Sequence, residues 1–161
     1  MSRYHAPAGL TVGHAHLKVS DLARAEAFYV GALGFTVKQR YGRQAVFLAA
    51  GDYHHHLGLN TWGSQGGRPP APGTTGLYHV AFLYPTRRDL AVVLKQLLAL
   101  GIPLDGAADH GVSQALYLRD PDGNGVELYW DRPIAEWPKD AAGGLAMGTE
   151  ALDLEALLAL A

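Results

Sequence analysis

Two histidines and one glutamate have the residue types and the places in the chain that could hold a metal ion. His14 and His79 lie near the starts of two apolar stretches, and Glu127 stands between Val126 and Leu128 in a third. Alternation along a strand sends such a glutamate to the face opposite its apolar neighbours. Two histidines and one carboxylate, with coordination positions left open, favour non-haem Fe(II) and oxygen chemistry. The three residues therefore predict an Fe(II) site, with Mn, Ni or Zn as alternative ions.

Other interpretations of these residues stay open. Glu127 can point outward from the solvated side of its strand, and His16 shares a face with His14 and can compete with it as a ligand. The chain has no cysteine, so a metal site must use nitrogen and oxygen donors. The nearest counterpart of Glu127 in the first half of the chain is Gly58. We therefore expect three protein ligands and not four.

An internal repeat gives the two histidines equivalent places. Each half predicts a strand, then a helix that ends at Gly34 or Gly101, then further strands that close near Trp62 or Trp130. Each half is thus a strand–helix–strand–strand–strand unit. If two such units pair about a pseudo-twofold axis, equivalent residues of their first strands face each other across it. The expected strands cover 13–19, 44–48 and 57–62 in the first half, and 78–83, 114–118 and 125–130 in the second, with the first helix over 22–33.

The repeat also predicts the domain organisation. We expect one domain over 10–131, in which module one (10–62) and module two (77–131) are joined by a Gly- and Pro-rich linker (63–76). A C-terminal extension over 132–161 carries a short amphipathic helix at 152–160. Its leucines expose more apolar side chain than a monomer needs. We therefore expect a homodimer or a higher homo-oligomer, with C2 symmetry favoured.

Composition limits the class of protein. The chain has 161 residues, of which 48% are apolar and 17% charged, and this is typical of a globular domain. Its formal net charge is −2 without a basic cluster, which disfavours a nucleic-acid partner. The N-terminus lacks the apolar core of a signal peptide, and no stretch approaches 18 apolar residues. We therefore expect a soluble cytoplasmic protein without a membrane partner.

Two motifs resemble those of the vicinal oxygen chelate superfamily, which includes glyoxalases, bleomycin-resistance proteins and extradiol dioxygenases. The first runs from His14 through Leu17 and Val19 to Asp21, and the second is Asp-Pro-Asp-Gly-Asn-Gly-Val-Glu over 120–127. The resemblance covers about residues 10 to 133. It implies an α+β fold in which two paired βαβββ modules form an open, eight-stranded, barrel-like metal site.

Three further residues resemble the type I extradiol dioxygenases, especially the catechol 2,3-dioxygenases. The run His54-His55-His56 resembles the strand that carries that family's acid–base histidine, which would be His56. Tyr117 and His110 resemble its active-site tyrosine and its second substrate-side histidine. Alternation agrees, because His54, His56 and Gly58 would share one face. Tyr117 can alternatively be a core aromatic, and the first two histidines of the run can be structural.

The resemblance implies an Fe(II)-dependent dioxygenase that takes a small aromatic diol and O2 as its substrates. A catechol would chelate the metal through both oxygens and leave as a ring-opened muconic semialdehyde. His56 would transfer the protons, while Tyr117 and His110 would hydrogen-bond the substrate. The alternatives are a glyoxalase-type isomerase or lyase on a divalent metal, and a metal-free antibiotic-binding resistance protein.

Overall fold

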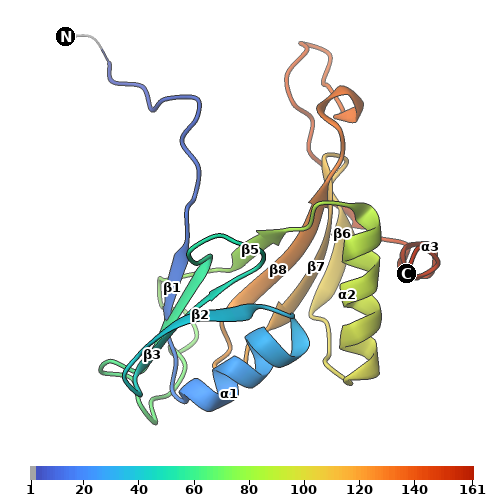
Figure 1. Ribbon diagram of the computed structural model, residues 1–161. Coiled ribbons are helices and arrows are strands. Elements are labelled where there is room, and N and C mark those ends of the chain that lie inside the picture. The colour runs from blue at the N-terminus through green and yellow to red at the C-terminus, as the bar shows by residue number, and fades with distance from the viewer. Residues whose placement is uncertain (1–2) are drawn as a thin grey trace.

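Two β-sheets form the body of the molecule in the computed structural model, which describes residues 3–161 (Figure 1). The first sheet has the order β1-β4-β3-β2, with the bounds β1 (Ala15–Lys18), β2 (Thr36–Tyr41), β3 (Ala45–Ala49) and β4 (Leu57–Asn60). The second has the order β5-β8-β7-β6-β9, with the bounds β5 (Val80–Leu83), β6 (Gly106–Asp109), β7 (Ser113–Arg119), β8 (Gly125–Asp131) and β9 (Glu150–Ala151).

Helices follow the first strand of each half, as the repeat predicts. They are α1 (Leu22–Glu26), which continues into the π-helical segment η1 (Ala27–Ala32), and α2 (Arg87–Ala99). Asp21 caps α1 by accepting from the Arg24 N–H, and Thr86 and Asp89 form a capping box at the start of α2. Two shorter elements follow the second sheet, the 3-10 turn η2 (Ile134–Glu136) and α3 (Leu154–Leu158). No helix in the described part of the chain is long and apolar enough to cross a membrane.

The two halves pair their strands in the same register. β1 runs parallel to β4, and β5 runs parallel to β8. Gly58 pairs with His16 in the first half, and Glu127 pairs with the equivalent Ala81 in the second. Gly58 is therefore the structural counterpart of Glu127. The α+β fold of two βαβββ units is confirmed, and β9 is an additional strand that the sequence did not predict.

One hydrophobic core joins the halves. Period-2 alternation in the strands and the 3.6-residue period in α2 direct apolar side chains toward it. Phe35, immediately before β2, packs edge-on against Phe82 of β5, with ring centroids 5.0 Å apart. Fully buried leucines come from both halves: Leu48, Leu57, Leu59, Leu90, Leu94, Leu97, Leu116 and Leu128.

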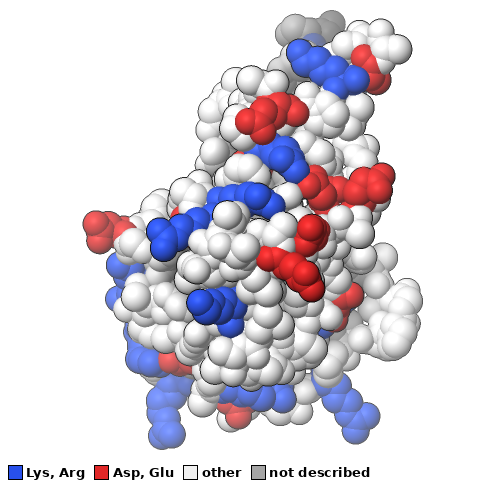
Figure 2. All heavy atoms as spheres, turned by 90° about the vertical axis from the view of Figure 1, so that its right-hand side faces the viewer, with Lys and Arg blue, Asp and Glu red and all other residues white. Residues whose placement is uncertain are grey.

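The C-terminal helix packs inward instead of offering an apolar face. α3 lies against α2, Leu157 is completely buried, and Leu152 is 9% exposed within the same core. The chain itself thus buries two of the leucines from which an oligomer was expected, while Leu160 stays 38% exposed, and the homo-oligomer stays a prediction. On the face shown in Figure 2, charged side chains of both signs are interspersed among uncharged ones.

Candidate metal centre

His79 and Glu127 lie in contact on the face of the second sheet that is turned away from the core. Val126 and Leu128 point into the core, so alternation turns Glu127 to the opposite face, where His79 directly precedes β5. His79 Nε2 lies 2.9 Å from Glu127 Oε2. Two donors bound at right angles to one divalent ion, each about 2.0–2.2 Å from it, are about 3 Å apart. The spacing fits two neighbouring ligands of one metal ion.

Tyr117 and His110 extend this pair into a chain of polar contacts. Tyr117 pairs with Glu127 across β7 and β8 and donates its hydroxyl to Glu127 Oε1 at 3.2 Å. The same hydroxyl oxygen lies 2.7 Å from His110 Nε2. Burial and, next, the neighbouring Glu127 raise the pKa of Tyr117 to about 12. Tyr117 is therefore a protonated phenol at neutral pH, and its hydroxyl lies between Glu127 and His110.

A small hollow opens beside these residues. Its volume is about 380 Å³, and His79, His110, Tyr117 and Thr149 are among the residues that line it. Pockets that bind small molecules begin at about 300 Å³. The hollow therefore has room for a single-ring ligand next to the His79–Glu127 pair.

His14 lines a second, larger hollow together with His79. This hollow of about 970 Å³ lies between residues before β1 and residues of β5. The His14 ring stands 4.4 Å from the ring of His55. Within residues 3–161, no three His, Cys, Asp or Glu side chains lie close enough together to hold a metal ion. The structure joins His79 to Glu127 but does not bring His14 to them.

His16, the alternative ligand in β1, contacts residues of the first sheet and not the His79–Glu127 pair. Its Nε2 lies 3.0 Å from the Asn60 side-chain amide, and its ring contacts Phe47 and Trp62. A Cβ added at Gly58 would meet the His16 ring at 2.9 Å. His16 thus covers the place where the counterpart of Glu127 would stand, and Gly58 supplies no fourth ligand.

The three consecutive histidines precede β4 instead of lying in it, because β4 begins at Leu57. His56 lies just outside the strand, so strand alternation does not fix whether it shares a face with Gly58, and its assigned role stays a prediction. His55 packs against Phe47, the residue that pairs with Gly58, and against His14. His56 instead accepts a hydrogen bond from the Ala50 N–H through Nδ1 at 3.3 Å, although it still lines the larger hollow.

His55 is a functional candidate that sequence reasoning missed. Burial and, next, the nearby His14 lower the pKa of His55, which favours the neutral imidazole that can take a proton. The signal in the sequence was the run of histidines itself. Which of the three histidines faces His14 depends on where β4 begins, and no local motif marks that point.

The residues present fit a divalent ion in donor type and in the geometry of His79 and Glu127. Nitrogen and carboxylate oxygen are the donors that non-haem Fe(II) uses. A complete two-histidine, one-carboxylate set would take its third donor from His14, which lines the same larger hollow as His79.

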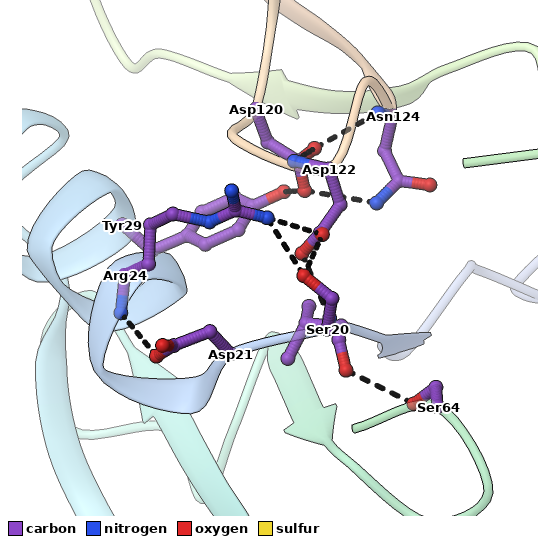
Figure 3. A network of polar contacts seen from close by, with 9 residues as sticks. Ser20, Asp21, Arg24, Tyr29, Ser64, Asp120, Asp122 and Asn124 are labelled. Carbon is purple, nitrogen blue, oxygen red and sulfur yellow. Dashed lines mark hydrogen bonds and ion pairs between the residues drawn. The ribbon is translucent and has the colours of Figure 1, made fainter. Parts of the chain in front are cut away.

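The turn that leads into β8 binds the two halves of the chain together (Figure 3). Asp120 closes the turn by accepting from the N–H groups of Asp122 and Asn124, and it also accepts from the buried Tyr29 hydroxyl at 3.0 Å. Asp122 accepts from the Ser20 N–H and hydroxyl and pairs with Arg24 at 2.6 Å. Sequence reasoning recognised this motif as a turn but missed its contacts with the first half.

A family model places the chain among known proteins. The model of the Glyoxalase/Bleomycin resistance protein/Dioxygenase superfamily matches residues 11–128. The chain belongs to this superfamily. Its members share the paired βαβββ architecture described above but differ in chemistry, so membership alone does not select a reaction.

Curated relatives include ring-cleaving dioxygenases. The chain is 42% identical over 147 residues to a catechol-2,3-dioxygenase of Bacillus subtilis (strain 168). The matched segment is 91% of this chain and 50% of that protein. The chain is 39% identical over 123 residues to biphenyl-2,3-diol 1,2-dioxygenase 3 of Rhodococcus globerulus, covering 74% of this chain and 63% of that protein. The chain thus spans between half and two thirds of the length of these relatives.

Solved structures share the fold. A glyoxalase/dioxygenase from Nostoc punctiforme superposes with a TM-score of 0.66 at 21% identity, covering 83% of this chain and 99% of that one. A lactoylglutathione lyase from Agrobacterium tumefaciens gives a TM-score of 0.59 at 25% identity, covering 78% of this chain and 96% of that one.

Proposed function

We propose that this protein is an Fe(II)-dependent extradiol dioxygenase that cleaves the ring of a small catechol with O2. The observation that supports it best is the 2.9 Å contact between His79 and Glu127, with Tyr117 and His110 extending from it along one side of a hollow. The similarity to dioxygenases of catechol and biphenyl-2,3-diol points to the same chemistry.

We assign His14, His79 and Glu127 as the metal ligands. His14 completes the set when its ring leaves His55 and turns toward the His79–Glu127 pair, since both histidines line one hollow. Bound Fe(II) would bring the electron-rich ring of the diol and dioxygen together in one site. Two histidines and one carboxylate leave coordination positions open for the two substrates.

Tyr117 and His110 hold the diol in place. The Tyr117 hydroxyl lies 3.2 Å from Glu127, so it hydrogen-bonds a substrate oxygen that lies next to the ligand carboxylate. His110 supports Tyr117 from behind at 2.7 Å. Both residues line the small hollow, which therefore receives the substrate ring.

A histidine outside the ligand set transfers the protons. A catechol must lose a proton as it binds, and the oxygen that enters the ring must gain one. The sequence motif assigns this role to His56, which lines the hollow of His14 and His79. The contact with His14 at 4.4 Å favours His55 instead. Both histidines are candidates for proton transfer in this proposal, and the turnover of the His55 and His56 variants distinguishes them.

The glyoxalase-type alternative is supported by the shared fold with a lactoylglutathione lyase. A Lewis-acid site of four protein ligands would need a donor at residue 58, which is glycine with the His16 ring against it. This observation favours the open three-ligand set and the dioxygenase.

An anaerobic reconstitution experiment tests the proposal. The protein is loaded with Fe(II) without oxygen, mixed with catechol, and then given air while O2 uptake and yellow ring-opened product are recorded. We expect one O2 consumed per ring opened, and loss of both signals in Glu127→Ala. Conversion of a glutathione hemithioacetal without catechol cleavage would instead establish the isomerase, and binding of an antibiotic without either reaction the resistance protein.

A further inference from the structure

His110 is held by a backbone carbonyl from a distant part of the chain. Its Nδ1 lies 2.8 Å from the carbonyl oxygen of Gly148, and the Gly148 N–H donates back to the His110 carbonyl at 3.1 Å. The Thr149 hydroxyl lies 3.4 Å from the same Nδ1. Gly148 follows the end of the family match at residue 128 by 20 positions. The C-terminal extension thus reaches a residue of the candidate site.

The extension is fixed on the C-terminal side of this contact. β9 pairs antiparallel with β6, so that Ala151 lies opposite Ala108 two residues before His110. Immediately after β9, Leu152 and Leu157 are buried in the core. The Gly148 carbonyl is therefore held in place by strand pairing and by core packing, and Thr149 lines the small hollow together with His110.

The chemistry of a carbonyl sets the protonation pattern of the His110 ring. A carbonyl oxygen can accept a hydrogen bond but cannot donate one, so Nδ1 must carry a hydrogen. In a neutral imidazole the other nitrogen is then bare. His110 Nε2 is consequently an acceptor for the Tyr117 hydroxyl at 2.7 Å. The hydroxyl has one hydrogen and two acceptors within reach, Glu127 Oε1 and His110 Nε2.

We propose that Gly148 is a positioning residue of the site, whose carbonyl fixes the tautomer and the orientation of His110. The C-terminal extension thereby holds His110 Nε2 as an acceptor for the Tyr117 hydrogen, in competition with Glu127 Oε1. The Tyr117 oxygen then offers its lone pairs to a hydroxyl donor in the small hollow. This last consequence rests on the proposed function, because an aromatic diol is the ligand that brings such a donor.

Nitrogen NMR of the full-length protein, labelled with ¹⁵N-histidine and kept free of metal, tests the proposal directly. The His110 signals are identified by their loss in His110→Asn. We expect His110 Nδ1 to carry a hydrogen in the wild type. Gly148→Pro removes the N–H that binds the His110 carbonyl and should give a mixture of tautomers. Gly148→Ala is the matched control, because an added Cβ meets nothing within 4 Å, and should keep the wild-type tautomer. A bare Nδ1 in the wild type, or an unchanged ring in folded Gly148→Pro, would overturn the proposal.

A second pair of variants avoids any change of backbone at Gly148. The Asn side chain of His110→Asn places an amide donor near the position of Nδ1 and can keep the bond to the carbonyl, whereas His110→Leu cannot. The Thr149 amide belongs to the same peptide group as that carbonyl and reports the bond. We expect its NMR signal to move in His110→Leu and to stay near the wild-type position in His110→Asn. Equal positions of this signal in both variants and the wild type would contradict the proposal.

The effect on turnover separates this proposal from the proposed function. Residues that orient a functional side chain from behind typically contribute about 10–100-fold to activity. We expect Gly148→Pro to lower kcat on catechol by that factor while iron content stays at the wild-type level. If the wild type shows the Nδ1–H tautomer but cleaves no catechol, the proposed function fails and the positioning role of Gly148 stands.

Discussion

Replacement of Asp122 by alanine should destabilise the protein, because it removes contacts between the two halves of the chain. Asp122 lies in the turn before β8, and its side chain is 10% exposed. It accepts from the Ser20 N–H at 3.1 Å, from the Ser20 hydroxyl and from Arg24 at 2.6 Å. These three contacts connect the second half to Ser20, which lies between β1 and α1, and to Arg24 in α1, as Figure 3 shows.

The magnitude follows from the burial of each partner. A buried donor left without its charged acceptor costs about 1–3 kcal/mol, and this range bounds the cost for the half-buried Ser20 N–H. Arg24 has a side chain that is 51% exposed, so its share of the pair is at most about 1 kcal/mol. Together they predict a loss of about 1–4 kcal/mol for Asp122→Ala. For a chain of this length that lowers Tm by about 2–16 °C.

Guanidinium-induced unfolding measures the loss, with a matched control inside the first half. Glu26→Ala breaks the pair of Glu26 with Arg40, whose side chain is 53% exposed, and should cost less than about 1 kcal/mol. A double-mutant cycle of Asp122→Ala with Arg24→Ala isolates the ion pair. If Asp122→Ala costs no more than Glu26→Ala, the contacts in Figure 3 do not hold the halves together and the reasoning is refuted.

Three further predictions concern other parts of the molecule. His55→Phe should keep its iron but lose about 10²–10⁴-fold in turnover, and a larger loss in His56→Phe would return the proton-transfer role to His56. Leu157→Ala should cost about 2–5 kcal/mol because the side chain is fully buried, and a loss below 1 kcal/mol in chemical unfolding would show that α3 is not docked. Burial and, next, Asp89 raise the pKa of Tyr84 from 10.0 to about 12. The neutral phenol thus stabilises the folded protein fully below pH 10, and this contribution is lost as the pH rises through 12. The free energy of unfolding should therefore fall less steeply with pH between about 10 and 12 in Tyr84→Phe than in the wild type. An equally steep fall in both proteins would contradict this assignment.

The repeated architecture could be predicted because its signals are local. Strand alternation, the Asp21 and Thr86 caps and the glycines after the helices recur in both halves, and each acts within a few residues. They also led to the equivalence of Gly58 and Glu127, which the register of β4 and β8 confirms.

The features that sequence reasoning missed depend on contacts between distant segments or on an exact strand boundary. The bond from Tyr29 to Asp120 joins residues 91 positions apart, and no pattern within either segment specifies its partner. The inward packing of Leu157 depends on the surface of α2 in the same way. The contact of His55 with His14 was not foreseen, because period-2 alternation was extended to residues that precede β4.

Metal binding by the His79–Glu127 pair and His14 is the central claim, and an Fe(II) titration of the metal-free protein tests it most directly. Anaerobic titration, followed by removal of free metal and iron analysis, should give one Fe(II) per chain in the wild type. We expect well below one Fe(II) per chain, with an unchanged circular dichroism spectrum, in each of three separate variants: His14→Ala, His79→Ala and Glu127→Ala. His16→Ala, which loses a ring bonded to Asn60, is the matched histidine control and should still bind one. Full iron retention in the His14→Ala and Glu127→Ala variants, or a wild type that binds none, would contradict the assignment.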